Sequence, residues 1–432
     1  MAEAHRSEWA FVLAATVRVT RDIDAAEECV QDAFARALTD WTRQGIPKKP
    51  GAWLTTVARR LAIDQQRRHA THARLVPLLV PEMESESEPR SGDEAADDRL
   101  RLIFTCCHPA LDLESQIALT LRFVCGLTTP EVARAFLIKE SAMAARLTRA
   151  KKKIAISRIP YHVPGAAELP DRIDAVLDVV HLVFTTGHTA PSGPRLVRDD
   201  LTSRALQLAR MLRDLLPDEP GVAGLLALIL LSDARRNART SNDGSMVLLE
   251  DQDRTKWDHE SIREGIELVH ESLTHRPPTR FALMAAIAAV HAEAPSFSET
   301  DWGEIVSIYD LLVLTWPSPV VALNRAVAIG FARGPLAGLA ALDELASDPF
   351  LAHYTYYESA RADTLDRLGR RGEAVASYEL ALQLTDNEVE RTFLQERLDA
   401  ITSARLAQTS LDRRSVPSIP SRIVDTSNEL HS

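Results

Sequence analysis

The chain has 432 residues, of which 45% are hydrophobic and only 5% aromatic, and its net charge is −11. The length predicts two to four domains, and the prevalence of alanine, leucine and arginine predicts an all-α fold. No apolar run reaches the ~20 residues that span a bilayer, and the start MAEAHRSEWAF lacks a signal-peptide pattern, so we expect a cytoplasmic protein with no membrane partner.

The number and spacing of the cysteines and histidines argue against disulfide bonds and metal sites. The four cysteines show no C-x-x-C spacing and suggest no disulfide framework, and the thirteen histidines lack the spacing of metal ligands. We therefore expect neither a metal nor a cofactor. In FTCCHPALD, 104–112, neighbouring helical residues point in different directions, so we expect Cys106 and Cys107 to pack as small buried side chains. Metal binding or redox sensing is the alternative.

Residues 5–72 are predicted to form helices. In DIDAAEECVQDAFARALTDW the apolar residues recur at helical spacing, and GIPKKPG then interrupts the helix with two prolines and two glycines. In the next segment, AWLTTVARRLAIDQQRR, arginines follow Trp53. Cations beside an aromatic ring suit a nucleic-acid strand with exposed bases, while an amphipathic core helix with a charged outer face is the alternative. The first helix begins unusually close to Met1, which leaves open a natural start further upstream.

An acidic segment separates this part from the next. PEMESESEPRSGDEAADD, 81–98, holds eight acidic residues and one arginine, with almost no apolar residue. That composition is typical of a disordered linker. Residues 1–160 are slightly basic, whereas the rest of the chain is strongly acidic. Only the first part is therefore a plausible partner for a polyanion.

Residues 128–153 are predicted to form a helix–turn–helix. Thr128 and Glu131 fit a capping box, and Pro130 fits the first turn of a helix. After the connection LIKES, a second helix buries an apolar stripe that includes Met143 and Leu147. A helix of this kind fits the major groove of a duplex, where its exposed face contacts the bases.

The second helix of this hairpin carries the candidate base-reading residues. Arg146 and Arg149 lie on neighbouring positions of one helical turn, and the lysine cluster at the end of the helix is suited to phosphates, which position a protein without specifying sequence. An ordinary helical hairpin with a solvated basic end is the alternative.

The long third part, about 165–402, is predicted to be helical by its periodicity. ARADTLDRLGRRGEAVASYELALQL has the spacings of a tetratricopeptide hairpin, and RAVAIGFARGPLAGLAALDEL resembles a weaker copy upstream. In DGSMVLLEDQDRTKWDHE we expect a capped loop-to-helix junction with exposed acids; a regulatory contact or ligand site is one alternative and catalysis another. The candidate residues for a regulatory contact are Asp243, Glu250, Asp251, Asp253, Arg254 and Trp257.

Three motifs in order carry a resemblance to a known family. DAAEECVQDAFARAL, then AWLTTVARRLAIDQQRR, and after the acidic linker LTLRFVCGLTTPEVARAFLIKESAMAARLTRAKKKI resemble bacterial RNA polymerase sigma factors of the extracytoplasmic-function type. The first two correspond to region two and the last to region four. The resemblance covers roughly the first 160 residues, and the third part looks like the fused helical extension of one subgroup.

The resemblance implies partners and site residues. Core RNA polymerase, through its β′ clamp helices and β flap, and promoter DNA are the implied partners. The implied polymerase-binding residues are Glu27, Glu28, Gln31, Asp32 and Phe34. Those implied to lie near the minus-ten element are Arg59, Arg60, Asp64, Arg67 and Arg68, with the loop 45–51 near an extruded base. Those implied to contact the minus-thirty-five element are Ser141, Ala142, Ala145, Arg146, Arg149 and Lys152.

The chain departs from the family pattern in the region-four hairpin. Lys139 stands where the family often has a small polar capping residue, and Ala144 and Ala145 offer no hydrogen bonds to bases. Base recognition is therefore expected to depend on Arg146, Arg149 and DNA shape.

The expected architecture is two small sigma domains followed by a large tetratricopeptide-like domain that regulates them by an intramolecular contact. The expected divisions are 1–75 for region two, 76–99 for the linker, 100–160 for region four, 161–402 for the extension and 403–432 for a flexible tail. Two other functions compete with the sigma factor. A stand-alone helix–turn–helix regulator with a sensor domain would leave the first two motifs unexplained, and an enzyme or scaffold would keep its activity without 1–160.

Overall fold

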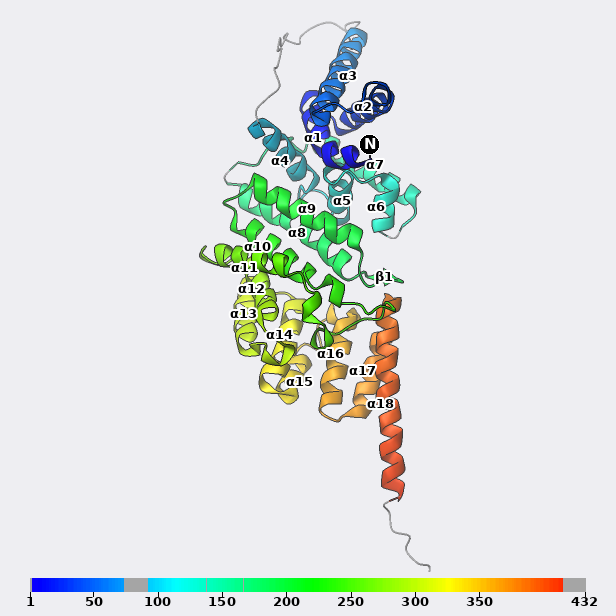
Figure 1. The fold of residues 1–432 in the computed structure, drawn as a ribbon, viewed down its shortest axis with the longest axis vertical. Coiled ribbons are helices and arrows are strands. Elements are labelled where there is room, and N and C mark those ends of the chain that lie inside the picture. The colour runs from blue at the N-terminus through cyan, green and yellow to red at the C-terminus, as the bar shows by residue number, and fades with distance from the viewer. Residues whose placement is uncertain (1, 74–91, 137, 166, 415–432) are drawn as a thin grey trace, which may run out of the picture. The chain divides into compact units, whose positions relative to one another are not determined.

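The computed structural model describes residues 2–73, 92–136, 138–165 and 167–414 (Figure 1). Residues 76–91 of the predicted linker and 415–432 of the predicted tail lie outside these ranges, whereas 92–99 and 403–414 belong to helices and not to the linker and tail that the composition suggested. Apart from two two-residue strands, the regular elements of the described residues are all helices, which confirms the all-α prediction. It divides into two compact units, the first formed by 1–190, 197–239 and 250–299 and the second by 191–196, 240–249 and 300–432. None of the described helices combines the length and apolarity needed to cross a membrane.

The first three helices pack on one another within the first unit. They are α1 (Ala2–Thr20), α2 (Ile23–Gln44) and α3 (Pro50–Ala73). The Asp22 carboxylate accepts a bond from the Ala25 amide at 2.9 Å and so caps the start of α2. The helix ends at Gly45, whose φ of 81° lies in the left-handed region that glycine tolerates. Trp9 and Leu54 are among the side chains buried at the centre.

The predicted helix–turn–helix is present. It follows α4 (Gly92–Cys106), α5 (Leu113–Leu119) and a short π-helix, η1 (Thr120–Val124), and consists of α6 (Thr129–Ala135) and α7 (Glu140–Ile156). The predicted capping box is confirmed, because the Thr128 hydroxyl accepts from the Glu131 amide and the Glu131 carboxylate accepts from the Thr128 amide. Lys139 occupies the cap of α7 and makes no capping bond with its side chain.

Five further helices complete the first unit. They are α8 (Leu169–His188), α9 (Asp199–Leu215), α10 (Pro220–Asp233), α11 (His259–Ser272) and α12 (Arg280–Glu293), with the 3-10 turns η2 (Arg236–Ala238), η3 (Leu249–Asp251), η4 (Arg254–Lys256) and η5 (Phe297–Glu299). Residues on every side of α10 are buried, as expected of a central helix. A Cβ at Gly224 would lie 2.6 Å from the Ala282 nitrogen, so glycine allows α10 and α12 to cross closely.

The second unit contains the two predicted helical hairpins. Its helices are α13 (Trp302–Thr315), α14 (Pro319–Arg333), α15 (Pro335–Asp343), η6 (Leu351–His353), α16 (Thr355–Arg367), α17 (Arg371–Leu384) and α18 (Glu388–Arg414). Tyr378 and Ala381 are buried between helices, as their spacing predicts. Two short strands, β1 (Ser192–Gly193) and β2 (Asp386–Asn387), pair in parallel, with Ser192 opposite Asp386.

The cysteine pair lies in the core of the first unit. Cys106 ends α4, both thiols are buried, and the Cys107 sulfur lies 3.4 Å from the Thr120 hydroxyl. Burial raises the pKa of Cys107 to about 12. Asp112 is not directed at the thiols, because its carboxylate caps α5 by accepting from the Ser115 amide at 2.9 Å. These contacts agree with structural packing, and redox sensing stays untested.

Candidate nucleic-acid interface and docking helix

The second helix of the helix–turn–helix, α7, separates its apolar and polar faces. Met143 and Leu147 are buried against the rest of the domain. Five of the six predicted base- or phosphate-contacting residues are exposed: Ser141, Ala142, Ala145, Arg149 and Lys152. The face that would enter a major groove is therefore open to solvent in this conformation.

Arg146, the sixth residue, is held by its own domain. Its guanidinium lies 2.6 Å from the Glu114 carboxylate of α5 and 5.4 Å from the centre of the Phe136 ring. The Glu114 side chain is 65% exposed, so this ion pair is a surface pair that nucleic acid can displace. Arg149 has no such restraint among the contacts described, and we regard it as the better candidate for base reading.

On α3 the predicted residues form one exposed row. Arg60, Asp64 and Arg67 are exposed and recur at spacings of four and three, which places them on one face. Arg59 is partly buried, and the side chain of Arg68 lies outside the described part of the chain. Three of the five predicted residues therefore share one exposed face, and their contact with DNA stays a prediction.

Trp53, at the start of α3, was expected to offer a stacking surface to bases. It packs edge-on against Trp41 of α2, with ring centroids 5.5 Å apart, and is only partly exposed. The ring therefore also joins α2 to α3.

The predicted polymerase-binding residues on α2 divide into exposed and buried members. Glu28, Gln31 and Asp32 are exposed. Phe34 is 7% exposed and stacks on Trp9 at 5.9 Å, so it belongs to the hydrophobic core. The exposed members fit a docking surface, and Phe34 supports that surface from below; their role in docking stays a prediction.

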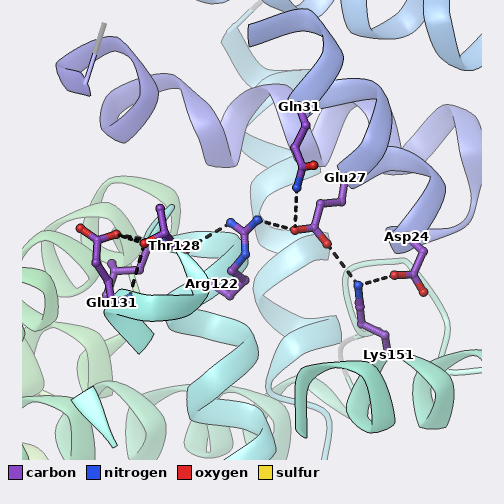
Figure 2. Close-up of polar contacts among 8 residues, drawn as sticks. Asp24, Glu27, Gln31, Arg122, Thr128, Glu131 and Lys151 are labelled. Atoms are coloured by element: carbon purple, nitrogen blue, oxygen red, sulfur yellow. Dashed lines mark hydrogen bonds and ion pairs between the residues drawn. The ribbon is translucent and has the colours of Figure 1, made fainter. Parts of the chain in front are cut away.

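Glu27 is the member of this set with the most contacts. Figure 2 shows its carboxylate between two cations of the helix–turn–helix part, with Arg122 on one side and Lys151 on the other. The Lys151 ammonium lies 3.2 Å from Glu27 and also pairs with Asp24. The Glu27, Arg122 and Lys151 side chains are only 13%, 9% and 16% exposed. Gln31 donates to the same Glu27 carboxylate at 3.3 Å.

Arg122 joins three parts of the first unit. Besides pairing with Glu27, it donates to the Leu127 carbonyl at 3.1 Å, just before the helix–turn–helix, and lies 4.7 Å from the centre of a Trp9 ring in α1. Burial lowers the pKa of Arg122, and Glu27 opposes this shift. Burial alone would also lower the pKa of Lys151, but Asp24 and Glu27 outweigh it and raise that pKa.

Sequence reasoning missed this ion-pair network. A signal existed in LTLRFVC, where Arg122 is a single charge inside an apolar run. A charge in such a position is buried and therefore needs a partner. The partner itself could not be deduced, because Glu27 lies 95 residues away.

Two arginines of the segment that follows the helix–turn–helix bind backbone carbonyls of earlier helices, one in α6 and one in α4. Arg198, at the start of α9, donates to the carbonyls of Arg134 and Ala135 at the end of α6, both at 3.0 Å. Arg172, in α8, donates to the Phe104 carbonyl in α4. Both side chains are buried, and each donates to backbone carbonyls at or near a helix end.

The candidate regulatory residues form a capped junction. Asp253 accepts from the Thr255 amide at 3.0 Å, and Asp258 caps α11. Arg254 donates to the carbonyls of His291 and Ala294, both at 2.7 Å, and lies over the ring of Trp257. Of the other candidates, Asp243, Glu250 and Asp251 are exposed. Among the residues that the structure describes, no three histidine, cysteine or acidic side chains gather as metal ligands would. A regulatory role for this junction stays a prediction.

Comparison with known proteins identifies three regions. Residues 6–71 match Sigma-70 region 2, residues 101–154 match Sigma-70, region 4, and residues 172–273 match a family of unknown function (DUF6596). "Uncharacterized protein R00370" of Rhizobium meliloti (strain 1021) is 42% identical over 396 residues, which cover 90% of this chain and 93% of that protein. The two sigma regions coincide with the two groups of helices that carry the exposed basic faces. The chain therefore belongs to the RNA polymerase sigma factors of the extracytoplasmic-function type that carry a fused C-terminal extension.

Proposed function

We propose that this sigma factor binds core RNA polymerase and directs transcription initiation at promoters with minus-thirty-five and minus-ten elements. The observation that supports this best is the open face of α7, where Arg149 and Lys152 are exposed beside small residues that let the helix approach the bases. The exposed charged row on α3 supplies the second DNA-contacting surface. The factor itself performs no covalent chemistry; it positions the polymerase and the DNA.

In this proposal, the exposed side of α2 binds the polymerase β′ clamp helices and region four contacts the β flap. Glu28 and Asp32 are exposed acids on α2 and suit a basic partner surface. Gln31 lies between them in sequence and is also exposed. On the DNA side, Arg149 contacts base edges while Lys152 contacts phosphate, so the two residues contribute differently to specificity.

We further propose that the C-terminal extension controls region four. Arg198 and Arg172 bind the backbone of α6 and α4, so the extension is bonded to the helix that precedes the recognition helix. A change in the extension that moves α8 or α9 would therefore act on the position of α7. Because the extension and region four belong to one chain, each is present at a high effective concentration for the other, which favours their contact.

Transcription in vitro with purified core polymerase and a matched promoter tests the proposed function. The full chain should direct initiation from that promoter and not from a template whose minus-thirty-five element is scrambled. Arg198→Ala should change the yield if the extension acts through region four, and Arg195→Ala, a nearby exposed arginine, is the matched control. A full chain that never directs promoter-specific initiation would overturn the sigma-factor assignment of function.

A further inference from the structure

The ion pairs of Glu27 connect the two DNA-contacting parts of the first unit. Glu27 lies on α2, within region two, while Arg122 and Lys151 lie in region four, and Lys151 is on the recognition helix α7 itself. All three side chains are largely buried. We call this set, Glu27 with Arg122 and Lys151, the Glu27 lock.

The conformation that the Glu27 lock holds is incompatible with simultaneous reading of both promoter elements. Elements centred 25 base pairs apart are separated by ~85 Å along a duplex that rises 3.4 Å per pair. At 1.5 Å per residue, α3 and α7 measure only ~60 Å even if they were laid end to end. Region two and region four must therefore separate, and the contacts of Lys151 with α2 must break.

The Glu27 lock also occupies a residue of the predicted docking surface. Glu27 belongs to the set expected to contact the polymerase, yet both of its carboxylate oxygens are engaged by cations of region four. The DNA face of α7 is exposed at the same time. The conformation held by the Glu27 lock therefore hinders docking on the polymerase and prevents simultaneous contact with both promoter elements. It leaves the DNA-contacting face of α7 exposed.

We propose that the Glu27 lock keeps the free sigma factor closed, and that Arg122 and Lys151 compete with the polymerase for the acidic face of α2. This inference rests on the proposed function, because it assumes that α2 docks on the polymerase. When region two and region four separate, the charged groups of Glu27, Arg122 and Lys151 return to water. Cations on a basic partner surface can then form ion pairs with Glu27 in place of Arg122 and Lys151. The Glu27 lock therefore predicts that the partner presents a basic surface to α2.

The variants that test the Glu27 lock change one charge at a time. Lys151→Gln removes one cation of the lock from region four without altering α2. Lys153→Gln, on an exposed lysine of the same helix, is the matched control. Glu27→Gln removes the anion and, with it, a predicted polymerase contact, so it should favour polymerase binding less than Lys151→Gln does.

The first measurement is the distance between region two and region four in the full-length protein. Cysteines introduced at Ala35 of α2 and Ala155 of α7, both exposed, carry a donor and an acceptor dye, while the four native cysteines are buried. Lys151→Gln and Glu27→Gln should both increase the low-transfer population relative to the unsubstituted protein. Lys153→Gln should leave it unchanged. Equal distributions for Lys151→Gln and Lys153→Gln would overturn the proposal.

The second measurement is the affinity for core polymerase without DNA. If only the open fraction can dock, Lys151→Gln should lower the apparent Kd, on the order of threefold or more, because the apparent Kd varies inversely with that fraction. Glu27→Gln should lower it less than Lys151→Gln does, because this variant opens the protein but also loses a predicted polymerase contact. An opened Lys151→Gln protein with an unchanged Kd would overturn competition for α2. If neither the unsubstituted protein nor any variant binds core polymerase, the proposed function fails. The distances between the two dyes would then still test whether the Glu27 lock holds region two and region four together.

Discussion

Glu27 and Arg122 form an ion pair across 95 residues of sequence, and both side chains are nearly buried. Arg122 cannot reach water in this arrangement without losing Glu27, the Leu127 carbonyl and the Trp9 ring. A cation with this many partners contributes to the stability of the first unit as well as to its conformation.

Arg122→Met should destabilise the first unit by about 3 kcal/mol, because it leaves a largely buried Glu27 carboxylate with Lys151 as its one cation. Urea unfolding at neutral pH measures this change, with Arg36→Met on the exposed side of α2 as the control. A loss below about 1 kcal/mol, the scale of an exposed pair, would contradict the importance of this contact.

Arg149→Ala should reduce discrimination among minus-thirty-five variants by ~1–3 kcal/mol, as expected when a bidentate base contact is lost. Lys152→Ala should instead weaken binding about equally on every sequence and reduce the salt dependence, because it removes a phosphate contact. Competition binding of the full chain to a panel of duplexes, repeated at two salt concentrations, separates these outcomes. A uniform loss for Arg149→Ala would assign this arginine to phosphate.

Arg198→Ala should cost ~1.5–3 kcal/mol of stability, because a buried guanidinium then no longer donates to the two carbonyls at the end of α6. The neighbouring exposed residue offers the control Arg195→Ala, which should change stability little. Chemical unfolding, followed by a probe on the helix–turn–helix, measures both. Similar values for the two variants would show that the carbonyl contacts contribute nothing.

Thiol labelling should be slow in the native protein. All four cysteines are buried, and the reactive thiolate form of Cys107 is suppressed because burial raises its pKa to about 12. A coloured disulfide reagent at pH 8 should react with all four thiols only after urea unfolds the chain. Rapid labelling of Cys106 or Cys107 without denaturant would instead favour a redox-sensing role.

The same thiols predict a loss of stability at alkaline pH. Burial raises the pKa of Cys107 and of Cys125 to about 12 in the folded protein, against an ordinary thiol pKa of 9.0. Between these values the unfolded chain loses protons that the folded chain retains, so stability falls as pH rises from about 9 towards 12. Each thiol contributes a slope of at most ~1.4 kcal/mol per pH unit. Cys107→Ala should flatten the pH profile of urea unfolding; an unchanged slope would contradict this origin.

Local sequence signals predicted the helix–turn–helix well. The capping box of Thr128 and Glu131, the proline in the first turn and the apolar stripe of α7 all act within a few residues, so their geometry follows from the helix itself. The exposed row on α3 followed from the same periodicity. The all-α fold and the sigma-factor family were also correctly predicted, because each depends on many such local signals in order.

Contacts between residues that are far apart in sequence could not be predicted from these local signals. Nothing near Glu27 in sequence indicates that cations from η1 and α7 surround it, and nothing near Arg198 indicates carbonyls of α6. Phe34 was expected on a docking surface, yet helical periodicity alone also allows the core position beside Trp9 that it occupies. Arg146 and Arg149 look equivalent in sequence, and only the fold distinguishes them, because it brings Glu114 and Phe136 to Arg146.

The pairing of β1 with β2 has a consequence for how this protein can be inherited and engineered. Ser192 and Asp386 belong to the same unit although most of the first unit's later helices lie between them in sequence. The chain therefore passes from one unit to the other five times, and a single cut cannot release either unit intact. All five crossings lie between residues 190 and 300, within the extension, so recombination at one breakpoint in this range would leave short segments without their partners. The extension is thus expected to be inherited as one block.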